Sequence, residues 1–208
     1  METLFKGIKE FNTTDFLEHK DLFQTLGKKQ SPHTLFIGCS DSRIVPNLIT
    51  KSLPGELFVI RNIANLVPYF RESNEFLSST SAIEYAVEVL QVSNIVVCGH
   101  SNCGGCNALY MDEKFLSSIP HTRKWLELAW PVRTAIEKDP VLFNDPVKRE
   151  WVTEQMNIIE QMNHLLTFPY IKDKYLRNEL TIMGWYYIIE TGEIFNYDIP
   201  EQKFIKVE

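Results

Sequence analysis

The sequence lacks the features of several common protein classes. It has no lysine- or arginine-rich run, and its 27 acidic residues outnumber its 21 basic ones, giving a formal net charge of −6. Nucleic-acid surfaces are basic, so we expect no nucleic-acid partner. No apolar stretch approaches the roughly 20 residues that span a membrane, and we expect no membrane partner. The sequence shows no internal repeat and no low-complexity segment.

Cysteine is also scarce, with four residues in 208. This number suits a reducing compartment better than a disulfide framework. The first ten residues carry Glu2 and Glu10 and lack the apolar core of a signal peptide. We therefore expect a cytoplasmic protein. A length of 208 residues with 44% hydrophobic side chains predicts a single domain over residues 1–208.

Two short polar clusters stand out against this background. Residues 39–43 (CSDSR) follow the apolar run 35–38, and residues 100–105 (HSNCGG) follow the run 94–99. Both runs are short and rich in β-branched or aromatic residues, which is typical of buried strands. Each cluster is therefore expected where a strand ends and a loop begins. Two thiols and an imidazole divided between two such loops indicate a zinc site.

The candidate ligands are Cys39, His100 and Cys103. A single cysteine at a strand end is usually a small buried core residue, but the combination favours metal binding. His100 and Cys103 have the i, i+3 spacing that lets one tight turn offer two ligands, and residues 104–105 (GG) allow close backbone approach. Three protein ligands leave the fourth tetrahedral position open, as in catalytic zinc sites.

The other two cysteines leave alternatives open. Cys98 lies within an expected strand and is interpreted as a core residue. Cys103 and Cys106 have Cys-x-x-Cys spacing, which also occurs in redox pairs. The same two residues could instead form a zinc pair that displaces Cys39.

Together the two clusters resemble the paired motifs of the β-class carbonic anhydrases. The likeness continues through residues 54–56 (PGE), 61–65 (RNIAN) and 81–86 (SAIEYA). It is dense over residues 30–110 and weaker in the flanking segments. The resemblance implies reversible, zinc-dependent hydration of carbon dioxide to bicarbonate and a proton. Zinc would supply the nucleophile by lowering the pKa of a bound water.

The resemblance also implies roles for residues around the ligands. Arg43 would pair with Asp41, and Asp41 would accept a hydrogen bond from the zinc-bound water. A guanidinium keeps a carboxylate ionised and fixes its direction, so the roles are physically sound. In some family members this aspartate instead ligates zinc. The residues that match the substrate pocket of the plant-like subgroup are Gln30, Phe58, Ile63, Tyr85 and Gly104.

Three of these pocket residues, Gln30, Phe58 and Tyr85, would come from a neighbouring subunit. Phe36 stands where the allosteric, bicarbonate-inhibited subgroup carries tryptophan, so the resemblance is to the non-allosteric subgroup. Residues 1–28 read as a helical arm with apolar stripes, and in the family such an arm packs across a dimer partner. We therefore expect a homodimer or a dimer of dimers.

Alternating strand and helix patterns predict an α/β fold with a mainly parallel sheet. The expected strands are residues 34–38, 57–60, 94–98 and 181–189, with an antiparallel fifth strand at 193–198. The strand order 2-1-3-4, with helices on both faces, is implied by the resemblance. Ligand sites in open α/β sheets lie beyond the carboxyl ends of strands at a switch in strand order, here between the first and third strands.

Three rival functions remain open at this point. The same zinc site could hydrolyse carbon disulfide or carbonyl sulfide, as close relatives of this fold do. A thiol-redox protein using Cys103 and Cys106 is a second rival. A non-catalytic zinc-binding module is the third, although the Asp41–Arg43 pair counts against it because a structural zinc site needs no such activating pair.

Overall fold

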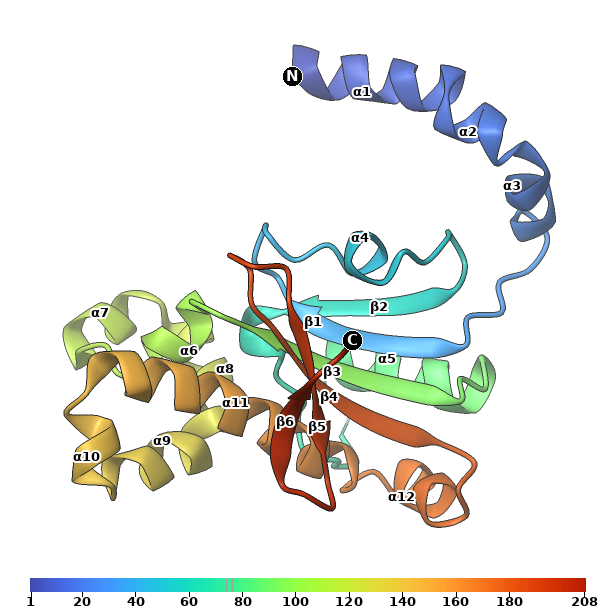
Figure 1. The fold of residues 1–208 in the computed structure, drawn as a ribbon. Coiled ribbons are helices and arrows are strands. Elements are labelled where there is room, and N and C mark those ends of the chain that lie inside the picture. Colours follow the sequence, from blue (N-terminus) through green and yellow to red (C-terminus); the bar gives the residue numbers. More distant parts are fainter. Residues whose placement is uncertain (74, 76) are drawn as a thin grey trace.

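A six-stranded sheet organises the part of the chain that the computed structural model describes, residues 1–73, 75 and 77–208 (Figure 1). The strands are β1 (Thr34–Cys39), β2 (Leu57–Asn62), β3 (Asn94–His100), β4 (Thr181–Tyr187), β5 (Ile194–Asp198) and β6 (Lys203–Lys206). Their spatial order is β2-β1-β3-β4-β5-β6, with β1 to β4 parallel and β5 and β6 antiparallel. The expected order 2-1-3-4 and the antiparallel fifth strand are confirmed. The sixth strand was not expected.

Helices fill the connections. They are α1 (Glu2–Thr13), α2 (Asp15–Glu18), α3 (Lys20–Leu26), α4 (Pro46–Thr50), α5 (Ser78–Glu84), α6 (Gly104–Ala108), α7 (Glu113–Ser118), α8 (Pro120–Leu126), α9 (Trp130–Glu137), α10 (Pro140–Phe143), α11 (Pro146–Leu165) and α12 (Pro169–Leu176), with 3-10 turns η1 (Ile63–Asn65) and η3 (Glu127–Ala129) and a π-helical turn η2 (Tyr85–Val89). A proline in the first turn begins several of them, because its missing N–H would be unpaired there anyway. Asp145 caps α11 by accepting a hydrogen bond from the Lys148 backbone N–H. The 3-10 turn η3 separates α8 from α9, and Pro131 lies in the first turn of α9.

Helix α11 packs directly onto the middle of the sheet. Gly99 in β3 and Gly184 in β4 face Ile158 of this helix, and a Cβ atom on either glycine would lie 2.7 to 2.8 Å from that side chain. Real Cβ atoms do not approach other side chains so closely. Because glycine has no Cβ atom, these two positions allow the helix to pack close to the strands. The largest core cluster forms around this contact and includes residues of β1, β3, β4, α5 and α12.

The opposite face of the sheet carries a smaller apolar cluster. Phe36, Val96 and Cys98 are buried there, and Trp185 packs edge-on against Phe36 with 6.2 Å between ring centroids. The segment after α4 borders this face beside a hollow of about 450 Å³. This side of the sheet is therefore less covered than the side that α11 occupies.

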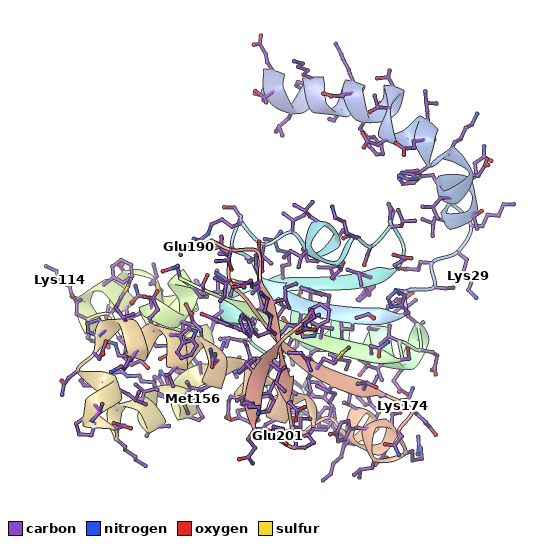
Figure 2. All side chains as sticks on the ribbon, viewed as in Figure 1. Lys29, Lys114, Met156, Lys174, Glu190 and Glu201 are labelled. Atoms are coloured by element: carbon purple, nitrogen blue, oxygen red, sulfur yellow. The ribbon has the colours of Figure 1, made fainter. Side chains whose placement is uncertain are left out.

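The N-terminal arm, α1 to α3, runs away from the sheet (Figure 1). None of its residues is buried, and Leu4, Phe5 and Ile8 are 73%, 59% and 55% exposed. Figure 2 shows the arm's side chains projecting into open space, with Lys29 near its junction with the rest of the chain. The expected helical arm consists of three helical segments, which pack together through the rings of Phe11, Phe16 and Phe23.

Crossing a membrane requires a helix both long and apolar, and the described residues contain no such helix.

Candidate metal centre

The three candidate ligands meet at the carboxyl ends of adjacent strands. Cys39 is the last residue of β1 and His100 the last of β3, and these two strands pair in parallel. Cys103 lies three residues further on, at the N-cap of α6, after a turn that Asn102 makes with φ of 56°. Parallel strands end at the same edge of a sheet, so two distant sequence clusters come together here.

The donor atoms of Cys39, His100 and Cys103 all lie within 4.8 Å of one another. The two Sγ atoms are 4.0 Å apart. All three side chains are buried, with residue exposures of 4%, 1% and 1%. The geometry therefore offers one nitrogen and two sulfur atoms to a single central position.

His100 presents the correct nitrogen for a ligand. Its Nδ1 lies 2.9 Å from the Ser101 carbonyl oxygen, and since a carbonyl only accepts, Nδ1 must carry the proton. Nε2 therefore holds a free lone pair, and this buried atom has no hydrogen-bond partner in the described chain. Buried polar atoms are rarely left unpaired. A metal ion bound at Nε2 would satisfy this atom.

The two thiols need a cation to ionise. Hydrogen bonding to Cys103 together with burial raises the pKa of Cys39 to about 12. Hydrogen bonding to Cys106 is the main cause that raises the pKa of Cys103 well above its ordinary value. Two adjacent buried thiolates repel each other, and a divalent ion that prefers sulfur and imidazole removes that repulsion. Zinc has this preference and takes four tetrahedral ligands, so the residues present fit it.

A carboxylate stands beside the open side of this group. Arg43 donates from Nε to Asp41 Oδ1 at 2.8 Å and from Nη2 to Oδ2 at 2.7 Å, and its backbone N–H also donates to Oδ1. The guanidinium and these hydrogen bonds hold the pKa of Asp41 well below its usual range. Asp41 Oδ2 lies 3.9 Å from His100 Nε2. An ionised, fixed acceptor thus faces the site that the ligands surround.

A hollow of about 350 Å³ opens next to the group. Its lining includes Cys39, Asp41, Ile63 and Gly104 together with Ser40, Gly105, Ala108, Met111, Phe115, Ile119 and Thr122. The sequence-based pocket residues Ile63 and Gly104 are therefore brought to the centre. The wall from Met111 to Thr122 was not foreseen, because it lies in the helical segment after the second motif, where no polar pattern marks it.

The other three expected pocket residues do not line this hollow. Phe58 and Tyr85 lie together, with 6.1 Å between ring centroids, and Gln30 is exposed between the arm and β1. A larger hollow of about 440 Å³ lies between α11 and the β5–β6 hairpin, and its lining contains no cysteine or histidine. We assign the chemistry to the smaller hollow because Cys39 and Asp41 line it.

The remaining cysteines are not part of the group. Cys98 is buried in β3, where burial raises its pKa to about 12. Cys106 is buried in α6 and receives a hydrogen bond from Asn157 Nδ2 to its Sγ at 3.8 Å. The group of potential ligands found among the described residues contains Cys39 and does not include Cys106.

Two charged residues support the centre without having been assigned a role from the sequence. Arg61 donates from Nε to the Cys39 carbonyl oxygen and from Nη2 to the Asp41 carbonyl oxygen, at 3.0 and 2.6 Å. Glu154 accepts a hydrogen bond from the Cys103 backbone N–H at 2.7 Å, and burial raises its pKa to about 7. The position of Arg61 within the RNIAN motif could have indicated its role from the sequence. No sequence signal indicated the role of Glu154, since a glutamate in a helix is normally expected to be exposed.

Comparison with known proteins gives consistent matches. The family described as carbonic anhydrase matches residues 34–194. A carbonic anhydrase from Helicobacter pylori (strain J99 / ATCC 700824) is 42% identical over 206 residues, covering 98% of this chain and 93% of that protein. The solved structure of the β-carbonic anhydrase CcaA superposes with a TM-score of 0.93 at 36% identity, covering 100% of this chain and 92% of that one. One of two tetrameric β-carbonic anhydrases from Sordaria macrospora matches with a TM-score of 0.80 at 30% identity, covering 94% and 97%.

Proposed function

This chain belongs to the β-class carbonic anhydrases, and from that premise we propose that it hydrates carbon dioxide reversibly to bicarbonate and a proton at a zinc ion. Cys39, His100 and Cys103 would hold the ion. The observation that carries the proposal is the buried, unpartnered Nε2 of His100 beside two thiols, with the Asp41 carboxylate 3.9 Å away. When bound, zinc supplies a nucleophile near neutral pH by making water more acidic.

Asp41 would orient the attacking water. Arg43 keeps this carboxylate ionised and holds it by two side-chain hydrogen bonds, so Asp41 can only accept. A fixed acceptor selects one orientation of the water, in which a lone pair of the water oxygen points toward the substrate. Arg43 also donates to the Asn102 carbonyl oxygen at 3.0 Å, which ties the Asp41 loop to the loop that carries His100 and Cys103.

The hollow suits an uncharged substrate. Ile63, Met111 and Phe115 give it an apolar wall, which favours carbon dioxide over solvent. The Gly104 backbone, at the start of α6, would donate to bicarbonate. Gln30, Phe58 and Tyr85 would complete the pocket from a neighbouring subunit, and this is supported by the fact that they do not line the hollow of their own chain.

We propose a homodimer or a dimer of dimers as the working assembly. The arm supports this, because Leu4, Phe5 and Ile8 are all more than half exposed in their own subunit, and exposed apolar surface of this kind usually marks an interface. A cytoplasmic location is supported by the four cysteines, all of which are free and therefore suit a reducing compartment.

A carbon dioxide hydration assay on protein of measured zinc content tests the proposed function. We expect one zinc ion per chain and activity that disappears with the metal. Carbon disulfide and carbonyl sulfide, assayed on the same preparation, separate the rival hydrolases, because the apolar wall alone does not exclude them. A thiol-redox activity of Cys103 and Cys106 would survive zinc removal, and a zinc-binding module would contain metal without turnover.

A further inference from the structure

Helix α11 presents a row of buried polar side chains to the sheet. Glu154, Asn157, Gln161 and His164 are all at most 2% exposed and follow one another at helical spacing. Each contacts the backbone of a loop at the carboxyl end of the sheet. Asn157 donates to the Ala64 carbonyl oxygen, Gln161 accepts from the Val67 N–H, and Nδ1 of His164 lies 2.7 Å from the Val67 carbonyl oxygen.

Glu154 is the member of this row that reaches the metal centre. Its Oε1 accepts from the Cys103 backbone N–H at 2.7 Å, and its Oε2 accepts from the Tyr186 hydroxyl at 2.7 Å. The carboxylate thus connects three elements: α11, the turn that carries Cys103, and β4. Charged groups are seldom buried to this degree unless they are held by good hydrogen bonds.

The turn that carries Cys103 needs such a support. Asn102 before it adopts a left-handed conformation, and Gly104 and Gly105 after it have no side chains to restrict the backbone. At the N-terminus of α6 the Cys103 N–H has no partner within the helix. Glu154 supplies that partner, and in doing so it fixes the peptide from which the Cys103 side chain leaves the backbone.

We propose that Glu154 is a positioning residue of the metal centre. Its carboxylate, oriented by Tyr186, holds the Cys103 peptide so that Sγ points to the position shared with Cys39 and His100. This inference rests on the proposed zinc site. It assigns to α11 the support that sets the geometry of one ligand, as hydrogen-bonded partners of metal ligands do in other sites.

The test compares Glu154→Leu, Glu154→Gln and Tyr186→Phe with the matched control Gln161→Leu. Gln161 is also buried on α11 and also accepts a loop N–H, but it does not touch the centre. Zinc affinity is measured by competition with a chelator, and ligand geometry by the visible spectrum of the cobalt-substituted protein. Neither measurement depends on turnover.

We expect Glu154→Leu to lower zinc affinity ~10 to 100-fold and to alter the cobalt spectrum. Glu154→Gln keeps an acceptor for the Cys103 N–H and should stay close to wild type, whereas Tyr186→Phe should give a smaller change of the same kind. Gln161→Leu should lower the unfolding temperature but leave zinc affinity and the spectrum unchanged.

Wild-type affinity and spectrum in Glu154→Leu would overturn the inference. Equal losses of zinc affinity in Glu154→Leu and Gln161→Leu would also overturn it, by showing a general effect on stability. If Glu154→Leu does not fold, an unaltered cobalt spectrum in Tyr186→Phe decides against the proposal. A failure of the proposed zinc site would give a different result. In that case Cys39→Ser would keep its zinc, which would show that the proposed ligand set is wrong.

Discussion

The metal centre and the N-terminal arm differ in how completely one chain builds them. At the centre, three ligands are buried, Arg43 holds Asp41, and Arg61 and Glu154 hold the loops. Along α1 to α3 no residue is buried. The chain alone therefore brings the proposed metal site together, whereas the arm, and with it part of the proposed substrate pocket, would be completed by the proposed second copy.

The largest effect should come from removing a ligand. Cys39→Ala, His100→Ala or Cys103→Ala should each abolish zinc binding and hydration activity, because two remaining donors cannot form the catalytic site. Cys106→Ser is the matched control, because Cys106 is another buried cysteine close to Cys103 in the sequence, and this variant should keep both zinc and activity. The zinc content of the purified variants tests this prediction. If Cys39→Ala retained zinc and Cys106→Ser lost it, Cys106 would replace Cys39 as the ligand.

Deleting residues 1–27 tests the other side of the comparison. We expect aggregated or inactive protein, because the shortened chain cannot cover its partner or complete the pocket. A milder variant, Ile8→Asp, places a charge on the apolar stripe and should weaken association, while Lys6→Ala on the opposite side of α1 should not. Sedimentation and activity are measured together. A soluble, active monomer without the arm would contradict the shared pocket.

The pH dependence of zinc affinity should be steep. Both thiol pKa values are raised, that of Cys39 to about 12, so the metal-free protein holds both protons near neutral pH and zinc must displace them. Affinity therefore rises with pH, by up to ~100-fold per pH unit for two protons, until the thiols ionise unaided. Calorimetry in buffers of different ionisation enthalpy counts the protons. Release of only one proton would show that one thiolate already exists without metal.

The smallest effect is expected at Asp41. Asp41→Asn should keep zinc and reduce activity ~10 to 100-fold, since an amide is uncharged and can present a donor to the water. Asp145→Asn makes the same chemical change away from the site and serves as the control. It should have little effect, because aspartate and asparagine both cap the N-terminus of a helix well. Stopped-flow assays of both variants at equal zinc content are needed. Full activity of Asp41→Asn would remove Asp41 from the mechanism.

Much of the architecture could be predicted because its signals are local. Short β-branched runs placed the ends of β1 and β3, so Cys39 and His100 could be expected at one edge of the sheet, although the strand order came from the resemblance. Strand β6 could not be expected from Lys203–Lys206, a four-residue edge strand with lysines at both ends. Helix α5 continues into the π-helical turn Tyr85–Val89, a change that apolar periodicity does not reveal.

Residues that support the centre were harder to predict than its ligands. The residue type of a cysteine or histidine already indicates metal binding, whereas Glu154 acts through its burial, which only the packing of α11 establishes. The wall formed by Met111 and Phe115 is similar, because apolar side chains in short helices resemble ordinary core until their position beside the ligands is known.

The close approach of α11 to the sheet makes the metal centre sensitive to single methyl groups. A Cβ atom on Gly99 would lie 2.7 Å from Ile158, and one on Gly184 would lie 2.5 Å from Met162 and 2.8 Å from Ile158. Adding one carbon at Gly184 would push the helix outward at a cost of about 1 to 3 kcal/mol, and Glu154, one turn along that helix, would move with it. Protein interiors transmit such displacements because they are tightly packed. The spacing of the candidate zinc ligands should therefore depend in part on the absence of Cβ atoms at Gly99 and Gly184.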